Sequence, residues 1–340
     1  MRLATTIAVS VMLAVPHAAA AQSPADFYKG KQISFIIRAA PGGNYDLYLR
    51  LLARHIVRYI PGNPTAVPMN MPGGGGLTAL NYFDKVAPKD GTSLTMVTQT
   101  APMDQALGLG TRLPLDVSKL NWIGNMSDEN LFLVTKNSAT KTIADARQRE
   151  TVLAATGAGG SEGIMASVLN TVLKTRIKNV FGYRSGPEMS LAVDRGEAEG
   201  RWTTNLRLLF AASGGAEAFN VVLQVGLKPD PAYPHVPLLR NLGSSPDDTA
   251  VLDFISRVMA LARPVATNQE APAERVAVLR QAFDLAVKDP EFLAEAKQQD
   301  LSISPWTGSE LQQVVADILA TPAPVRERVK QTIQADVPGR

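Results

Sequence analysis

The chain of 340 residues is 45% hydrophobic, has a formal net charge of +3 and contains no cysteine. The lack of cysteine excludes disulfides, a lipoprotein anchor, thiol catalysis and thiolate metal sites. The nearly balanced charge gives no sign of a nucleic-acid-binding surface. The length exceeds what one hydrophobic core usually supports, so two lobes are expected.

Residues 1–21 have the pattern of a cleavable secretory signal peptide. Arg2 precedes the apolar run IAVSVMLAV, and a run of alanines precedes Gln22. This pattern predicts cleavage after Ala21. The apolar run is too short for a membrane span, and no later stretch approaches the ~18 apolar residues that a span needs. We therefore expect an exported protein, and export without disulfides suits the bacterial periplasm.

Strands and helices are predicted to alternate along the chain. Strands are expected at 32–39, 66–72 and 91–99, and helices at 45–60, 73–87 and 101–110. Three such units favour a parallel sheet covered on both faces. A second α/β series follows, with strands at 121–125, 131–137, 151–157, 179–185, 198–205 and 219–226 and helices at 141–148, 161–173 and 187–197. After a proline-rich loop at 228–246, a strand at 263–268 and helices at 246–262, 272–299 and 309–319 complete the chain.

Three glycine-rich turns each lie between a predicted strand and a predicted helix: APGGNYD (40–46), MPGGGGL (71–77) and TGAGGSEG (156–163). In open α/β sheets such turns meet at the carboxyl ends of the strands. A helix start there offers unpaired N–H groups and the positive end of the helix dipole. The turns contain no lysine and no phosphate-loop or dinucleotide pattern, which favours a carboxylate over a phosphate. The alternative is that the glycines only allow close packing.

These turns belong to longer segments that resemble one family. Together with VFGYRSGPEMSLAVDRGEAEG (180–200) and LARPVATNQEAPAERVAVLRQAFDLAVKDPEFLAEAKQQ (261–299), they resemble the Bug family of tripartite tricarboxylate transporter receptors, also called TctC-like. The resemblance spans nearly the whole mature chain in order. It implies the α/β type II periplasmic binding protein fold, in which two lobes surround a central ligand cleft. Lobe 1 is expected at 27–122 and 264–340, lobe 2 at 123–263, and the hinge near 121–125 and 261–265.

The resemblance also implies a function, which is to capture a small organic carboxylate by lobe closure. The expected partners are that ligand and integral-membrane permease subunits of the TctA/TctB type, for a monomer that is not an enzyme and needs no cofactor, metal or nucleic acid. The expected ligand-binding residues are Pro41, Gly42, Gly43, Asn44, Asp46, Gly73, Gly74, Gly75, Gly76, Thr98, Gln99, Gly157, Gly159, Gly160, Ser161, Tyr183, Arg184, Arg201 and Thr203.

Arginines distinguish this chain from many members of the family. YRSG (183–186) and AEGRWTTN (198–205) stand where many members have Tyr-Lys-Gly and a later Val-Asp-x-x-Phe run. Arg184 and Arg201 are therefore candidates for a second ligand carboxylate, which favours a di- or tricarboxylate. The alternative is that they pair with the nearby Glu188 and Glu199.

Further roles stay open for three residues of these segments. Asp46 in the first turn of its helix suits the helix dipole as well as a ligand. Trp202 and Tyr45 are candidates for stacking on an aromatic acid, or for the core or hinge.

An enzyme is the main alternative function. GGSEG (159–163) satisfies G-x-S-x-G between a strand and a helix, as in a serine hydrolase. A triad would need Ser161, His235 and either Asp194 or Asp230. The mature chain has only one other histidine, His55, and the two histidines have no metal-ligand spacing. A receptor that signals to a membrane sensor is a further alternative.

Overall fold

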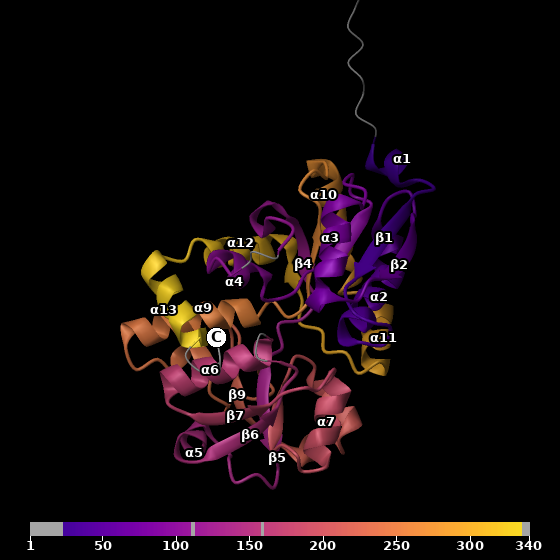
Figure 1. The fold of residues 1–340 in the computed structure, drawn as a ribbon. Helices are drawn as coiled ribbons and strands as arrows, with labels where there is room; N and C mark the ends of the chain where they lie inside the picture. Colours follow the sequence, from indigo (N-terminus) through magenta and orange to yellow (C-terminus); the bar gives the residue numbers. More distant parts are fainter. Residues whose placement is uncertain (1–22, 110–112, 158–159, 335–340) are drawn as a thin grey trace, which may run out of the picture.

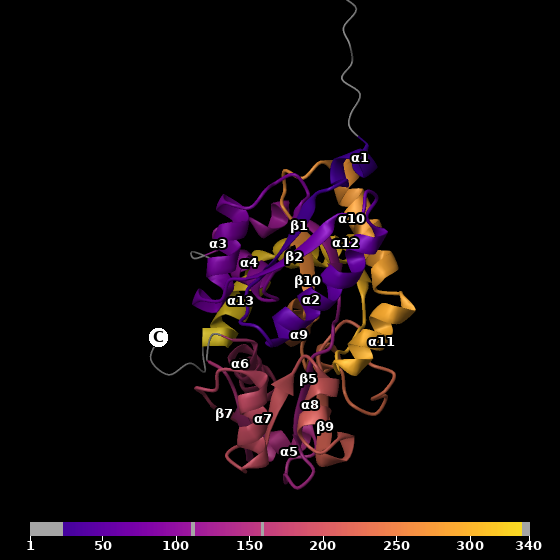
Figure 2. The ribbon, with the colours of Figure 1, turned by 90° about the vertical axis from the view of Figure 1, so that its right-hand side faces the viewer.

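The computed structural model describes residues 23–109, 113–157 and 160–334, so the predicted signal peptide at 1–21 lies outside the described residues. Two β-sheets with helices on their faces form the molecule. Figures 1 and 2 show the first sheet above the second in both views. Within the described residues, no helix is long and apolar enough to cross a membrane.

The first sheet combines strands from three parts of the chain. Within the described residues its strand order is β11-β4-β10-β3-β1-β2. The strands are β1 (Gln32–Ile37), β2 (Thr65–Asn70), β3 (Ser93–Met96), β4 (Asn121–Asn125), β10 (Pro264–Thr267) and β11 (Trp306–Thr307). Strands β2, β1 and β3 are parallel, as predicted, but β10 runs antiparallel to β3 and β4, and β11 antiparallel to β4. The sheet is therefore mixed, because β4 and β10 carry the chain away from it and back.

Helices cover both faces of this sheet. They are α1 (Pro24–Tyr28), α2 (Asn44–Ile56), α3 (Leu77–Lys85), α4 (Ala101–Ala106), α10 (Ala273–Ala286), α11 (Pro290–Gln298) and α12 (Gly308–Leu319). The short 3₁₀ segments are η1 (Val57–Tyr59), η2 (Gly74–Gly76) and η3 (Val117–Lys119). The single helix predicted at 272–299 is wrong. Pro290 cannot continue a helix, and the Asp289 side chain accepts the Glu291 N–H to begin α11.

The second sheet has the order β7-β6-β8-β5-β9 within the described residues. Its strands are β5 (Leu131–Thr135), β6 (Glu150–Ala154), β7 (Arg176–Val180), β8 (Gly200–Thr203) and β9 (Phe219–Gln224). Its helices are α5 (Ile143–Gln148), α6 (Ser161–Leu173), α7 (Gly186–Asp194) and α8 (Leu206–Ala212), with η4 (Ala216–Ala218) and η5 (Leu239–Asn241). Strand β7 begins at Arg176 and ends at Val180, well short of the end of the 179–185 range predicted for it, because Gly182 at φ 112° turns the chain towards α7.

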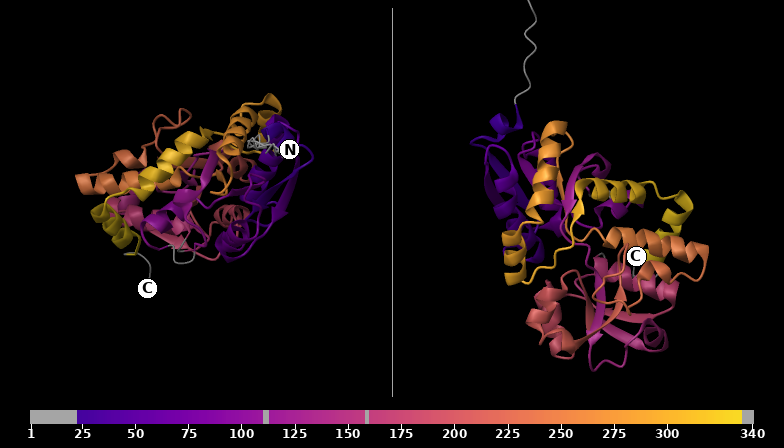
Figure 3. Two further views of the ribbon diagram at one scale, coloured as in Figure 1. Left: turned by 90° about the horizontal axis from the view of Figure 1, so that it is seen from above. Right: turned by 180° about the vertical axis from the view of Figure 1, so that it is seen from behind.

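The last helix contacts the helices of the second sheet. α13 (Ala323–Gln334) packs against α6 and α9 (Pro246–Met259), and α9 also packs against α12. Figure 3 shows the yellow α13 beside the orange α9 when the molecule is seen from behind. One buried apolar cluster therefore runs from Trp122 of the first sheet through Ile255 to Leu153 of the second. The lobe boundaries at 27–122, 264–340 and 123–263 stay a prediction.

The chain passes between the sheets after β4 and before β10, which pair side by side. The buried Asn125 side chain connects these two segments. Its amide donates to the Ala260 carbonyl at 3.0 Å, and its oxygen accepts the Arg263 N–H at 2.9 Å. The segments predicted as the hinge, 121–125 and 261–265, therefore lie next to each other.

Candidate functional site

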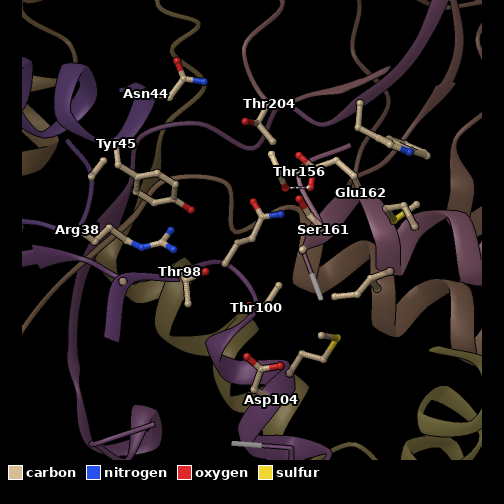
Figure 4. Close-up of a pocket in the computed structure, with 18 of the residues that line it drawn as sticks. Arg38, Asn44, Tyr45, Thr98, Thr100, Asp104, Thr156, Ser161, Glu162 and Thr204 are labelled. Atoms are coloured by element: carbon tan, nitrogen blue, oxygen red, sulfur yellow. Dashed lines mark hydrogen bonds between the residues drawn. The ribbon is translucent and has the colours of Figure 1, made fainter. Parts of the chain in front are cut away.

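A cavity of about 870 Å³ lies between the two sheets and is lined by residues of both. Its volume is in the range of small-molecule sites. Figure 4 shows Arg38, Asn44 and Tyr45 on one side, Ser161 and Glu162 on the other, and Thr98 between them. The cavity thus lies where loops following strands of both sheets meet.

Residues from all three predicted glycine turns line this cavity. The predicted residues that line it are Asn44, Gly73, Gly74, Gly76, Thr98, Gln99, Gly160, Ser161, Arg184, Arg201 and Thr203. The predicted residues that do not line it are Pro41, Gly42, Gly43, Asp46, Gly157 and Tyr183. The surroundings of Gly75 lie outside what the structure describes. Gly159 lies outside the described residues.

Three helices begin at this cavity with a glycine as N-cap. Gly43 precedes α2, Gly76 precedes α3 and Gly160 precedes α6, and no side chain of these caps bonds the first turn. By contrast, Thr142 and Ser245 cap α5 and α9 with their hydroxyl groups. Helix starts without a side-chain cap leave first-turn N–H groups available to an anion. The starts of α2 and α6 therefore offer first-turn N–H groups at this cavity, whereas at the start of α3 the Leu77 N–H already donates to the Gly74 carbonyl of η2.

Asp46 supports the first turn and does not line the cavity. Its carboxylate accepts the Gly42 N–H at 2.8 Å, Nδ2 of Asn70 at 2.7 Å and Nε of Arg50 at 2.7 Å. Burial raises the pKa of Asp46, but the hydrogen bonds from Asn70, Gly42 and Arg50 outweigh burial and hold this pKa below its usual value. The carboxylate thereby fixes the turn that begins α2, which argues against direct ligand contact.

Asp46→Ala is expected to lower the free energy of unfolding by about 2 kcal/mol at pH 7, because three hydrogen bonds to a charged acceptor are lost. The pKa of Asp46 is lower in the folded than in the unfolded protein. Its contribution is therefore present above the unfolded pKa, near 3.8, and is lost as the pH falls through the folded value. Urea unfolding at pH 7 and at pH 3 measures the difference in the free energy of unfolding between wild type and Asp46→Ala. This difference is expected to be smaller at pH 3.

The matched control for this prediction is Asp194→Ala. Asp194 is exposed at the end of α7. Its replacement is expected to change stability by less than about 0.5 kcal/mol at either pH. An Asp46→Ala protein as stable as wild type would contradict the structural role.

Arg38 is a cavity residue that the sequence pattern did not select. It follows β1 directly, and its guanidinium carbon lies 4.4 Å from the centre of the Tyr45 ring, so the two side chains stack. A Cβ atom on Gly76 would overlap Nε of Arg38 and lie 3.0 Å from its Cζ. Gly76 also has φ +105°, which disfavours other residues. The sequence feature that could have identified Arg38 as a cavity residue is its place directly after a predicted buried strand, where a cation is unusual.

Arg201 is a buried cation in β8 at the cavity wall, 6% exposed. It donates to Oγ of Ser190 at 2.8 Å, to the Trp202 carbonyl at 3.1 Å and to the Gly186 carbonyl. Burial lowers its pKa to about 10, so it stays protonated at neutral pH. Among the ion pairs of the described residues, Glu199 pairs with Arg149 and not with Arg201.

Arg263 is a second buried cation, 2% exposed, and the sequence analysis did not predict it. Its guanidinium donates to the Ala262 carbonyl at 2.6 Å and to Oγ1 of Thr204 at 2.9 Å. Its Cζ lies 5.1 Å from the ring centre of Tyr45 and 4.7 Å from that of Tyr48. In the part of the chain that the structure describes, neither Arg201 nor Arg263 forms an ion pair with a carboxylate. Without a direct pair, Arg201 still interacts electrostatically with Glu162, and Arg263 with the buried Glu129. A buried cation whose charge is only partly compensated favours binding of an anion.

The other predicted polar residues have structural partners. Arg184 lines the cavity but has a strongly exposed side chain that pairs with Glu188 at 2.7 Å. This ion pair is the alternative to ligand binding that the sequence analysis gave for Arg184. The hydroxyl of Tyr183 donates to Glu197 at 3.0 Å. Gln99 contacts Met259, with 3.4 Å between Nε2 and Sδ.

Trp202 and Thr203, which follow Arg201 in β8, line the cavity and also contact other residues of the protein. Thr203 donates its hydroxyl to the Asn205 carbonyl at 3.0 Å. The Trp202 ring packs 5.1 Å from that of Phe132 while also lining the cavity. Tyr45 likewise lines the cavity and stacks on Arg38.

The residues required for a hydrolase are not assembled around Ser161. His235 is exposed, and His55 bonds Glu295 at 2.6 Å. Neither histidine is among the cavity residues, and Asp194 and Asp230 are also outside that set. Across the described ranges, no group of three or more His, Cys, Asp or Glu residues could hold a metal ion.

Comparison with known proteins gives one sequence relative and clear structural neighbours. No protein-family model matches the sequence. Protein BugT of Bordetella pertussis is 31% identical over 176 residues, which is 49% of this chain and 53% of that protein. The match thus spans about half the length of this curated relative.

Two solved structures have a similar fold. A TctC solute-binding protein from Polaromonas has a TM-score of 0.66 at 17% identity, over 91% of this chain and 99% of that chain. MatC from Rhodopseudomonas palustris with bound malate has a TM-score of 0.61 at 17% identity, over 89% and 99%. The predicted two-lobe α/β periplasmic binding protein fold is confirmed, and the names of these proteins agree with the resemblance stated from the sequence.

Proposed function

We propose that this chain, as a relative of the Bug/TctC-like solute-binding proteins, captures a small organic carboxylate between its two lobes. The relatives are binding proteins and not enzymes, so the proposed role ends with capture and delivery of the ligand. The cavity between the two sheets is the proposed binding site, and its occupant is an acid with at least one carboxylate.

The observation that carries this proposal is the convergence of three helix starts with glycine N-caps on one cavity. Backbone N–H groups at such positions bind anions without any catalytic side chain. Two cations also support this proposal, because Arg201 and Arg263 line the cavity and form no direct ion pair with a carboxylate among the described residues. A few charge-assisted hydrogen bonds of about 1.5–3 kcal/mol each are enough for micromolar affinity.

Lobe closure is the proposed mechanism. The glycine N-caps Gly43 and Gly76 belong to helices on the first sheet, and Gly160 to a helix on the second. A carboxylate that bonds both sets has a higher affinity for the closed form and shifts the population towards it. The paired segments around Asn125 and Arg263 are the proposed hinge.

We also propose that the protein works in the periplasm as a monomer and delivers its ligand to a permease of the TctA/TctB type. The support is the signal-peptide pattern at 1–21 and the names of the relatives. Mass spectrometry of the exported protein tests the location, since cleavage after Ala21 gives a chain that begins at Gln22. A secreted chain that retains residues 1–21 would contradict this part of the proposal.

Capture is tested with freshly purified protein. Native mass spectrometry detects any acid that copurifies, and isothermal titration then measures the affinity for malate, adipate, citrate and glutamate. We expect at least one micromolar ligand, and small-angle X-ray scattering is expected to show a smaller radius of gyration once this ligand is bound. No bound acid in either measurement, or labelling of Ser161 by a fluorophosphonate, would overturn the proposed function.

A further inference from the structure

Asp104 places a carboxylate in the proposed acid-binding cavity. It lies in α4, one turn after Thr100, and both residues line the cavity. Figure 4 shows Thr98 and Thr100 between Arg38 and Asp104, so the cation and the acid lie at different ends of the view. The cavity therefore has both a basic and an acidic part.

Among the described residues, no cation pairs with Asp104. Burial raises its pKa to about 6, and a hydrogen bond from Thr100 offsets burial only in part. No lysine, arginine or histidine of the described residues forms an ion pair with it. At neutral pH the carboxylate is still mostly ionised, since its pKa lies below 7. A partly buried charge of this kind is stabilised by a ligand cation.

Glu162, the other acid of the cavity, has different surroundings. It accepts the Thr156 hydroxyl at 3.1 Å. It is also close enough to Arg201 to raise the pKa of that arginine, so the two charges partly compensate each other. Asp104 has no such cation in the part of the chain that the structure describes, and this difference singles out Asp104 as the acidic contact for a ligand.

Apolar side chains also line the cavity that contains Asp104. Leu77 and Leu80 come from α3, Met103 from α4, and Ile164 and Met165 from α6. These side chains suit the aliphatic part of a ligand. A second carboxylate placed beyond that part would approach Asp104 and be repelled, whereas a protonated amine would form a charge-assisted pair.

We propose that Asp104 makes this cavity selective for a zwitterionic acid, whose carboxylate is held by the helix starts and whose protonated amine pairs with Asp104. The inference rests on the proposed function and names the ligand class within it. A purely structural role is the alternative, because an acid in the first turn of a helix also interacts favourably with the helix dipole.

The test compares ligands of matched length. The ω-amino acids from 3-aminopropanoate to 6-aminohexanoate are titrated beside the dicarboxylates from succinate to pimelate. For wild type we expect at least one amino acid to bind ~10-fold or more tightly than the dicarboxylate of equal span. Asp104→Asn is expected to lower the affinity for that amino acid by ~10-fold or more. The affinity for the dicarboxylate should stay the same or rise.

Glu274→Gln is the matched control, since Glu274 is an exposed acid in the first turn of α10 and does not line the cavity. It should leave every affinity unchanged. Thermal unfolding without ligand adds a second readout: Asp104→Asn raises the melting temperature if burial of the charge is costly, and lowers it if the charge serves only the helix dipole.

The outcomes distinguish the proposed function, carboxylate capture, from the proposed selectivity for a zwitterionic acid. Dicarboxylates that bind more tightly than all amino acids, with a preference that Asp104→Asn does not change, overturn the selectivity but leave carboxylate capture intact. An equal loss for both ligand classes in Asp104→Asn, together with a lower melting temperature, assigns Asp104 a structural role only. Binding of no acid of either class overturns the proposed function itself.

Discussion

Arg263→Met is expected to weaken binding of the preferred acid by at least ~100-fold, because two charge-assisted hydrogen bonds to a carboxylate are worth about 3–6 kcal/mol. The guanidinium is held between Thr204 and the rings of Tyr45 and Tyr48, so it is already oriented before the ligand arrives. Methionine fills a similar volume without the charge, but it removes a cation that interacts with the buried Glu129, so some loss of stability is expected beside the loss of affinity. Isothermal titration measures the affinity, and circular dichroism checks the fold.

Two further variants make this result specific. Arg263→Lys keeps the charge but loses the planar fork, and an intermediate affinity is expected. Arg275→Met is the matched control, since Arg275 also stacks on a ring, that of Phe27 at 3.4 Å, but lies outside the cavity. A dissociation constant for Arg263→Met within twofold of wild type would remove Arg263 from the binding site.

Gly200→Ala is expected to lower the free energy of unfolding by at least about 3 kcal/mol, as overpacking against rigid backbone does. A Cβ atom at this position would overlap the Leu133 carbonyl oxygen and lie 2.7 Å from Cα of Val134. These are backbone atoms of the neighbouring strand β5, so they cannot rotate away. Strand β8 also provides Arg201 to the cavity, and any folded fraction should bind the acid weakly. Urea unfolding followed by circular dichroism measures the loss.

Gly226→Ala is the control for this prediction. Its added Cβ would have the Lys228 carbonyl as nearest neighbour at 3.8 Å, which is an ordinary contact. A change below about 1 kcal/mol is expected there. If Gly200→Ala unfolds at the same urea concentration as Gly226→Ala, the packing of β8 against β5 is less tight than described.

Sequence patterns predicted those strands and helices well whose formation depends on residues close together in the chain. Strand β1 consists mostly of buried apolar residues, and the glycine turns before α2, α3 and α6 mark a change from strand to helix. The failures also have a local cause that was overlooked, as with Pro290, which ends one helix and begins another. The antiparallel direction of β10 could not be read from its sequence, because the direction depends on where the chain crosses between the sheets.

Charged residues were the least predictable part of the site. Asp46 was expected to bind the ligand. Its carboxylate instead accepts a hydrogen bond from Asn70, 24 positions away, and stabilises the turn before α2. Arg263 was not selected, because its burial depends on Thr204, 59 positions earlier, and on Tyr45 and Tyr48 of α2. A charged side chain has the same local sequence signal whether it is exposed, paired or directed into a cavity.

The sequence by itself determined the α/β class, the absence of thiol chemistry and the three glycine turns that begin helices, because each depends on residues close together in the chain. The tertiary structure alone decided that these helix starts meet at one cavity, that Arg201 and Arg263 are buried there without a direct ion pair in the described residues, and that Asp104 lines the same cavity. The physical reason is that burial and charge pairing are set by contacts between distant segments, and those contacts exist only once both sheets have folded and packed together.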